Sequence, residues 1–133
     1  HLPSVDQVIL YNNQSPYTIA LIVPNKDALK RTLSFSNLTL DTEEGRKAAL
    51  KKMEEELNKY KKGGEFEGMF PERWLPSTFA ILPEPFTEQN QMINSTMKMV
   101  RGKIEKAYAD RIDYLYTPEG KQILNEKNLE CIK

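Results

Sequence analysis

Two apolar runs near the start of the chain predict a β-hairpin. Residues 5–11 and 17–23 are rich in β-branched, aromatic and other apolar side chains, and the polar, turn-forming segment 12–16 separates them. Two such runs joined by a short polar turn favour antiparallel pairing. Because both runs are almost continuously apolar, we expect helices to cover at least one face of the resulting sheet. A third strand is expected over residues 77–82, which read Ser-Thr-Phe-Ala-Ile-Leu.

Apolar residues at helical spacing follow the hairpin in two segments. Asn25 is a suitable N-cap for a short helix over residues 26–33. A longer helix is expected to begin at a capping box formed by Asp41 and Glu44, and to run as far as Gly63. The residues expected to face the core from these two helices are Ala28, Leu29, Thr32, Leu33, Leu50, Met53, Leu57 and Tyr60.

The outer face of the longer helix is expected to be solvated. Lysine and glutamate alternate there at i,i+4 spacing, which stabilises an exposed helix by about 0.2–0.5 kcal/mol per pair. The expected pairs are Lys51 with Glu55, Lys52 with Glu56, and Glu55 with Lys59. Adjacent glutamates on a helix point in different directions, and lysines offset them here, so we expect no metal to be held by this chain.

Glycine and proline interrupt residues 65–76 and predict an ordered loop. Phe66, Phe70 and Trp74 lie within this loop. We expect their rings to pin the loop onto the core, the alternative being that they form a recognition surface.

The C-terminal part of the chain is expected to be helical. An apolar stripe begins after Arg101 and consists of Ile104, Ala107, Tyr108, Ile112 and Leu115. Thr117-Pro118-Glu119 then predicts the start of a last helix that extends through Asn125. The order of two strands, two helices, one strand and two helices predicts an α+β domain with a small, largely antiparallel sheet packed against helices.

Length and charge narrow the functional classes. The chain has 133 residues, and its 19 basic and 19 acidic side chains give a formal net charge of zero. This length supports one compact domain, and the charge balance argues against a nucleic-acid binder. One cysteine, Cys131, and one histidine, His1, exclude a disulfide framework, a Cys/His zinc site and a histidine-based triad. With no membrane-length apolar run and no signal peptide, we expect a soluble, cytoplasmic protein, and we treat His1 as internal to a longer chain.

One segment, residues 87–103, could carry chemistry. It gathers Lys98, Arg101 and Lys103 after a run of small hydroxyl and amide residues that turn sharply and donate hydrogen bonds. Such a loop could place an ammonium group beside a phosphate or a carboxylate. Taken alone, the composition favours the plainer interpretation, in which these are solvated charges at the start of a helix.

A series of short segments instead favours a chemical role for residues 87–103. The series consists of Asp6-Gln7-Val8, Leu21-Ile22-Val23-Pro24-Asn25, Arg73-Trp74-Leu75-Pro76-Ser77, Leu82-Pro83-Glu84-Pro85-Phe86-Thr87 and Ser95-Thr96-Met97-Lys98. In this order, it resembles the C-terminal subdomain of long-chain fatty-acid–CoA ligases, which belong to the adenylate-forming, AMP-binding enzyme superfamily. The resemblance extends from about residue 5 to about residue 116.

The resemblance singles out Lys98. The family's late motif, Leu-Thr-Pro-Thr-x-Lys in long-chain members or Ser-Gly-Lys in others, is similar to Ile93-Asn94-Ser95-Thr96-Met97-Lys98. It implies that Lys98 is the catalytic adenylation lysine, and that Thr96 and Arg101 contact the nucleotide or coenzyme. The chain departs from the family at Ser95, where long-chain members usually have proline, and at Val100, where a Lys-Arg pair is common. Both departures leave Lys98 in register.

The resemblance also implies partners. Residues 1–133 would form a single, mobile C-terminal subdomain that works against an N-terminal AMP-binding domain, with that domain and the hinge outside this chain. The whole enzyme would use ATP, coenzyme A, Mg²⁺ and a fatty acid, and could associate peripherally with membranes. This chain alone would be inactive and would hold no cofactor. The alternative is a non-catalytic α+β protein-interaction module whose basic loop binds a partner.

Overall fold

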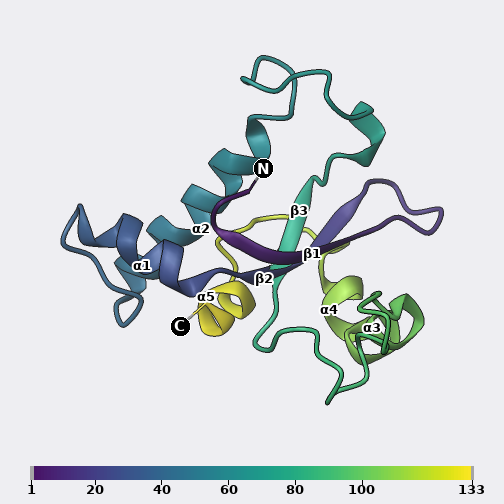
Figure 1. The fold of residues 1–133 in the computed structure, drawn as a ribbon. Coiled ribbons are helices and arrows are strands. Elements are labelled where there is room, and N and C mark those ends of the chain that lie inside the picture. Colours follow the sequence, from purple (N-terminus) through teal and green to yellow (C-terminus); the bar gives the residue numbers. More distant parts are fainter. Residues whose placement is uncertain (1, 133) are drawn as a thin grey trace.

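A three-stranded sheet with helices on both sides forms the centre of the protein (Figure 1). The structure is a computed structural model that describes residues 2–132, the side chain of Glu72 excepted, so that His1 lies outside the described residues. In chain order the elements are β1 (Val5–Tyr11), β2 (Ile19–Pro24), α1 (Lys26–Ser34), α2 (Glu43–Asn58), the 3-10 helix η1 (Glu72–Trp74), β3 (Thr78–Ile81), α3 (Arg101–Ala107), α4 (Ala109–Tyr114) and α5 (Glu126–Cys131).

The sheet has the strand order β1-β2-β3. β1 and β2 form the predicted antiparallel hairpin, in which Ile9 lies opposite Leu21. β3 runs parallel to β2, with Ala80 beside Leu21. Parallel neighbours need a long crossover, and α1 and α2 supply it here. The predicted α+β class with a small sheet packed against helices is confirmed. The sheet is mixed, since the β1–β2 pair is antiparallel and the crossover returns the chain so that β3 runs in the direction of β2.

β2 is buried along its whole length and supplies two separate halves of the core. Ala20 and Ile22 belong to a cluster with α1, α2 and α5, whereas Leu21 and Val23 belong to a cluster with α3 and α4. Successive strand residues point to opposite faces, so a continuous apolar run suits a strand covered on both sides. Figure 1 shows the same division, with α1, α2 and α5 on one side of the sheet and α3 and α4 on the other.

Side-chain caps set the starts of the two crossover helices. The Asn25 side chain accepts a hydrogen bond from Ala28 N at 3.0 Å, as predicted for α1. The cap of α2 is Thr42 and not Asp41, because Thr42 Oγ1 accepts from Gly45 N at 3.1 Å. A Cβ on Gly45 would lie 1.7 Å from a carbonyl oxygen of the preceding loop, so this helix start packs tightly against that loop.

The prediction that the outer face of α2 is solvated is wrong at Glu56, whose exposed fraction is only 2%. Its carboxylate accepts a hydrogen bond from Ser4 N at 2.9 Å and another from Ser4 Oγ at 2.5 Å. This carboxylate therefore ties the segment before β1 to α2. The ion pair that forms along the helix is Lys47 with Glu43, with Nζ and Oε1 3.6 Å apart.

The C-terminal helices differ from the prediction in two places. The expected long helix after Arg101 is divided into α3 and α4 at Tyr108, whose φ of −114° and ψ of 24° are not helical. The expected helix from Thr117 to Asn125 is wrong, because this segment forms turns and α5 begins only after Asn125. The Asn125 side chain accepts a hydrogen bond from Asn128 N at 2.9 Å and so caps α5 instead of ending a helix.

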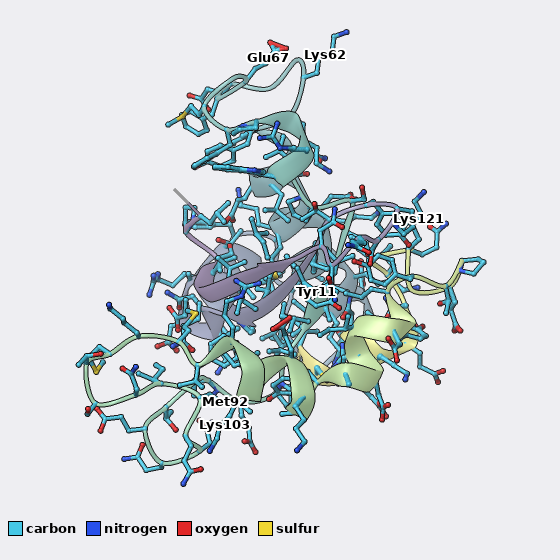
Figure 2. The ribbon with its side chains drawn as sticks, turned by 90° about the vertical axis from the view of Figure 1, so that its right-hand side faces the viewer. Tyr11, Lys62, Glu67, Met92, Lys103 and Lys121 are labelled. Carbon is cyan, nitrogen blue, oxygen red and sulfur yellow. The ribbon has the colours of Figure 1, made fainter. Side chains whose placement is uncertain are left out.

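The loop between α2 and β3, residues 59–77, extends away from the sheet in both views (Figures 1 and 2). The rings of Phe66 and Phe70 lie 5.2 and 5.5 Å from the ring of Tyr60, in agreement with the expected packing. Phe70 and Trp74 nevertheless remain 46% and 51% exposed, and both line an apolar groove of about 260 Å³. Phe66 and Phe70 thus pack on Tyr60, while Phe70 and Trp74 leave apolar surface at this end of the molecule.

Candidate functional site

A tight hairpin carries the predicted catalytic lysine. Ile93 and Met99 form an antiparallel bridge, and Asn94 N donates to Lys98 O at 2.9 Å. Met97 N donates to Asn94 O at 3.0 Å, and Met97 has a φ of +65°. This is the arrangement of a turn followed by one left-handed residue, in which glycine is usually favoured. It leaves Met97 in a strained conformation.

The side chain of Asn94 organises the hairpin. Its single Oδ1 accepts hydrogen bonds from Thr96 N at 3.0 Å, Thr96 Oγ1 at 2.7 Å and Lys98 N at 3.0 Å. Sequence reasoning assigned Asn94 no role. The available signal was an asparagine at the first position of a turn, where its side chain can bond the backbone two or more residues later.

Lys98 lies exposed on this hairpin. Its backbone N–H and C=O are both bonded to Asn94. Within residues 2–132, no hydrogen bond or ion pair holds its ammonium group. A fixed backbone and an unpaired ammonium on a long side chain allow a cation to be presented to a group outside this domain.

The other predicted contact residues have partners inside the domain. The Thr96 hydroxyl donates to Asn94 Oδ1, so its oxygen can still accept a hydrogen bond. Arg101 Nη2 donates to the carbonyl of Leu10 in β1, and this bond fastens the start of α3 to the sheet. Lys103 Nζ donates to Gln91 Oε1 within the loop. The fold therefore presents Lys98 freely, while Arg101 and Lys103 also hold the loop in place.

The loop that contains the hairpin is anchored at its base. Val100 N donates to Met92 O at 2.8 Å, and Asn90 Nδ2 donates to Pro85 O at 2.9 Å. Figure 2 shows Met92 and Lys103 at this base, with the loop projecting from the helices. A projecting hairpin on a fixed base suits contact with a second domain or a partner.

Between residues 2 and 132, no group of three or more His, Cys, Asp or Glu side chains is placed to hold a metal ion. None of the helices in this range is both long and apolar enough to cross a membrane.

Comparison with curated proteins finds a carboxylic acid reductase and two CoA ligases or synthetases among the relatives. The chain is 28% identical over 116 residues to a carboxylic acid reductase of Mycobacterium tuberculosis, covering 86% of this chain and 9% of that protein. It is 29% identical over 119 residues to a probable CoA ligase of Humulus lupulus, covering 86% of this chain and 17% of that protein. It is 25% identical over 118 residues to a long chain acyl-CoA synthetase of Arabidopsis thaliana, covering 84% and 16%. The chain thus spans between 9% and 17% of the length of these relatives. No protein-family model matches it.

Solved structures share the fold. The A-PCP didomain of a carboxylic acid reductase from Segniliparus rugosus, in complex with AMP, matches with a TM-score of 0.60 and 24% identity over 91% of this chain and 15% of that one. The adenylation domain of a carboxylate reductase from Mycobacterium chelonae matches with a TM-score of 0.57 and 23% identity, over 86% of this chain and 16% of that one. The chain therefore has the fold of part of an adenylation domain, and it resembles such domains of CoA ligases and carboxylic acid reductases.

Proposed function

We propose that this chain is the C-terminal subdomain of an ATP-dependent long-chain fatty-acid–CoA ligase, and that Lys98 is its adenylation lysine. The observation that carries the proposal is the ammonium of Lys98, which is exposed and has no partner among the described side chains, on a hairpin that projects from the fold. Support comes from the similarity of residues 93–98 to the late motif of the family. A long chain acyl-CoA synthetase is also among the relatives of the chain.

In the proposed first step, a carboxylate oxygen of the fatty acid attacks the α-phosphorus of ATP. The new O–P bond forms as the bond to the bridging oxygen of pyrophosphate breaks, and negative charge increases on the phosphoryl oxygens. A cation held beside those oxygens in a site that excludes water stabilises the transition state. Lys98 would supply this cation by reaching into the N-terminal AMP-binding domain, and Thr96 and Arg101 would contact the nucleotide or coenzyme beside it.

In the proposed second step, the coenzyme A thiolate attacks the acyl carbon of the acyl-adenylate. A C–S bond forms, the C–O bond to AMP breaks, and AMP leaves. The subdomain would rotate between the two steps, withdrawing Lys98, as mobile domains of enzymes commonly do. The Mg²⁺ of the whole enzyme would be bound with ATP in the N-terminal domain.

The test uses the full-length protein that contains this chain. Acyl-adenylate formation is measured in a single turnover for the wild type and for Lys98→Ala, and thioester formation from preformed acyl-adenylate is measured in parallel. We expect Lys98→Ala to slow the first step by about 10²–10³-fold, because that is the usual cost of removing one positioned group that stabilises charge in the transition state. The second step should be largely unchanged.

Lys106→Ala is the matched control, because Lys106 is another exposed lysine, on α3, and its loss changes the net charge equally. This control should keep the wild-type rate in both steps. A normal rate of adenylation in Lys98→Ala would contradict the catalytic role, and would favour the non-catalytic interaction module instead.

A further inference from the structure

We infer that Asn94 is the residue that positions Lys98 for adenylation, an inference that rests on the function proposed above. Asn94 bonds both polar groups of the Lys98 backbone: its Oδ1 accepts from Lys98 N at 3.0 Å, and its own N–H donates to Lys98 O at 2.9 Å. One residue therefore sets where the Cα of Lys98 lies and in which direction its side chain leaves the hairpin.

The same oxygen also fixes the residue two positions before the lysine. Thr96 N and Thr96 Oγ1 donate to it at 3.0 and 2.7 Å. With Lys98 N, three donors from two residues thus converge on a single acceptor. Removing the Asn94 carboxamide would release all three bonds together.

The hairpin has little else to hold it. Residues 94–99 are all exposed, so almost no apolar burial stabilises the tip. Met97 has a φ of +65°, a conformation unfavourable for a residue with a Cβ. A strained backbone persists only where its surroundings hold it, and here those surroundings are mainly the bonds to Asn94. Without them, we expect the turn to relax and Lys98 to sample several positions.

Asn94 contacts no reacting group in this scheme and acts only through Lys98. A displacement of about 1 Å in a group that participates in the reaction can cost about 100-fold in rate. Asn94→Ala should therefore slow acyl-adenylate formation by about 10- to 100-fold, a loss that approaches the effect of Lys98→Ala without exceeding it. Thioester formation from preformed acyl-adenylate should stay at the wild-type rate, because Lys98 is withdrawn in that step.

The experiment compares four variants of the full-length protein in the two half-reactions: Asn94→Ala, Lys98→Ala, the double variant, and Ser95→Ala as the matched control. Ser95 is exposed, belongs to the same turn, and contributes no side-chain hydrogen bond to the hairpin that the structure records for residues 2–132. Ser95→Ala should match the wild type. The double variant should be no slower than Lys98→Ala, because a residue that acts through Lys98 has nothing left to position. General damage to the fold would instead lower the rate of the double variant further and would slow both half-reactions.

Each result has a defined meaning. Lys98→Ala at the wild-type rate would overturn the proposed function itself. If Lys98→Ala forms acyl-adenylate slowly but Asn94→Ala does so within about twofold of the wild-type rate, the proposed function stands and the role of Asn94 is overturned. Additive losses in the double variant would also overturn it. Hydrogen exchange at Lys98 N provides an independent readout, since Asn94→Ala should speed this exchange and Ser95→Ala should not.

Discussion

Asn128 closes the free edge of β3, and its replacement should destabilise the protein severely. The residue is fully buried in α5. Its Oδ1 accepts from Ile81 N at 2.9 Å and from Arg111 Nη2 at 3.1 Å. Its Nδ2 donates to Phe79 O at 2.9 Å and to Ile123 O at 3.0 Å. The carboxamide therefore bonds one N–H and one C=O of β3, as the backbone of a fourth strand would.

The size of the effect follows from the groups left without partners. Asn128→Ala would remove four hydrogen bonds, and Ile81 N and Phe79 O lie in residues that are at most 1% exposed. A buried polar group without a partner costs about 1–3 kcal/mol. Two such groups, together with the lost bonds to Arg111 and Ile123, predict a loss of about 3–5 kcal/mol in the free energy of unfolding. That is a large part of the 5–15 kcal/mol typical of a whole domain.

Urea-induced unfolding, followed by circular dichroism, measures this loss. Asn125→Ala is the matched control, because it removes a buried asparagine of the same segment that caps α5 and donates to Gln122 O at 2.8 Å but does not contact β3. It should cost about 1–2 kcal/mol. Hydrogen exchange at Ile81 N should also become much faster in Asn128→Ala. If Asn128→Ala costs no more than Asn125→Ala, or if Ile81 N stays protected, the carboxamide does not serve as the partner of the strand edge.

Three further predictions concern single side chains. Glu56→Ala should lower the free energy of unfolding by about 2–3 kcal/mol, because it leaves the buried N–H and hydroxyl of Ser4 unpaired. Its control, Glu55→Ala on the exposed face of α2, should stay within about 0.5 kcal/mol of the wild type. Equal urea midpoints for the two variants would contradict this prediction. Met97→Gly should raise stability by about 0.5–1 kcal/mol, because glycine relieves the left-handed strain and Met97 is 71% exposed; a lower melting temperature would contradict it. Burial, and then the charge of Glu84, raise the pKa of Tyr108. A raised pKa favours the protonated phenol in the folded protein, so this contribution is present below about pH 10 and is lost as the pH rises through the folded pKa. As the pH rises from about 9 to about 11, the free energy of unfolding should therefore fall less in Tyr108→Phe than in the wild type. If the two proteins lose stability in parallel, titration of Tyr108 does not contribute to the loss.

Several elements could be predicted because short-range physics determines them. The β1–β2 hairpin follows from two apolar runs and a polar turn, and α1 follows from its Asn25 cap and the buried residues Leu29 and Leu33. The apolar run of β2 likewise indicated a strand covered by helices, and the structure covers both its faces. In each case the residues that specify the element lie close together in the sequence.

The errors arose where distant residues compete with local preference. Glu56 was assigned to the solvated face from its neighbours in α2, but Ser4, 52 positions away, supplies two donors and lets the carboxylate be buried. Thr117 begins turns and not a helix, and Gly120 packs so closely on α4 that a Cβ there would lie 1.9 Å from Tyr114 O. Neither contact leaves a periodic trace in the sequence.

For the candidate site, the register of the lysine motif pointed to Lys98 from the sequence, because spacing within six residues is a local property. The tertiary structure decided which of the three cationic side chains in residues 87–103 has no partner within the domain. Arg101 is bonded to β1, 91 positions earlier in the chain, and Lys103 is bonded to Gln91, whereas Lys98 keeps its ammonium unpaired within the described residues. It also decided that β3 pairs in parallel with β2 and takes Asn128 as the partner of its free edge. Local sequence determines which elements form, but hydrogen bonds and packing between distant segments determine which polar groups remain available for function.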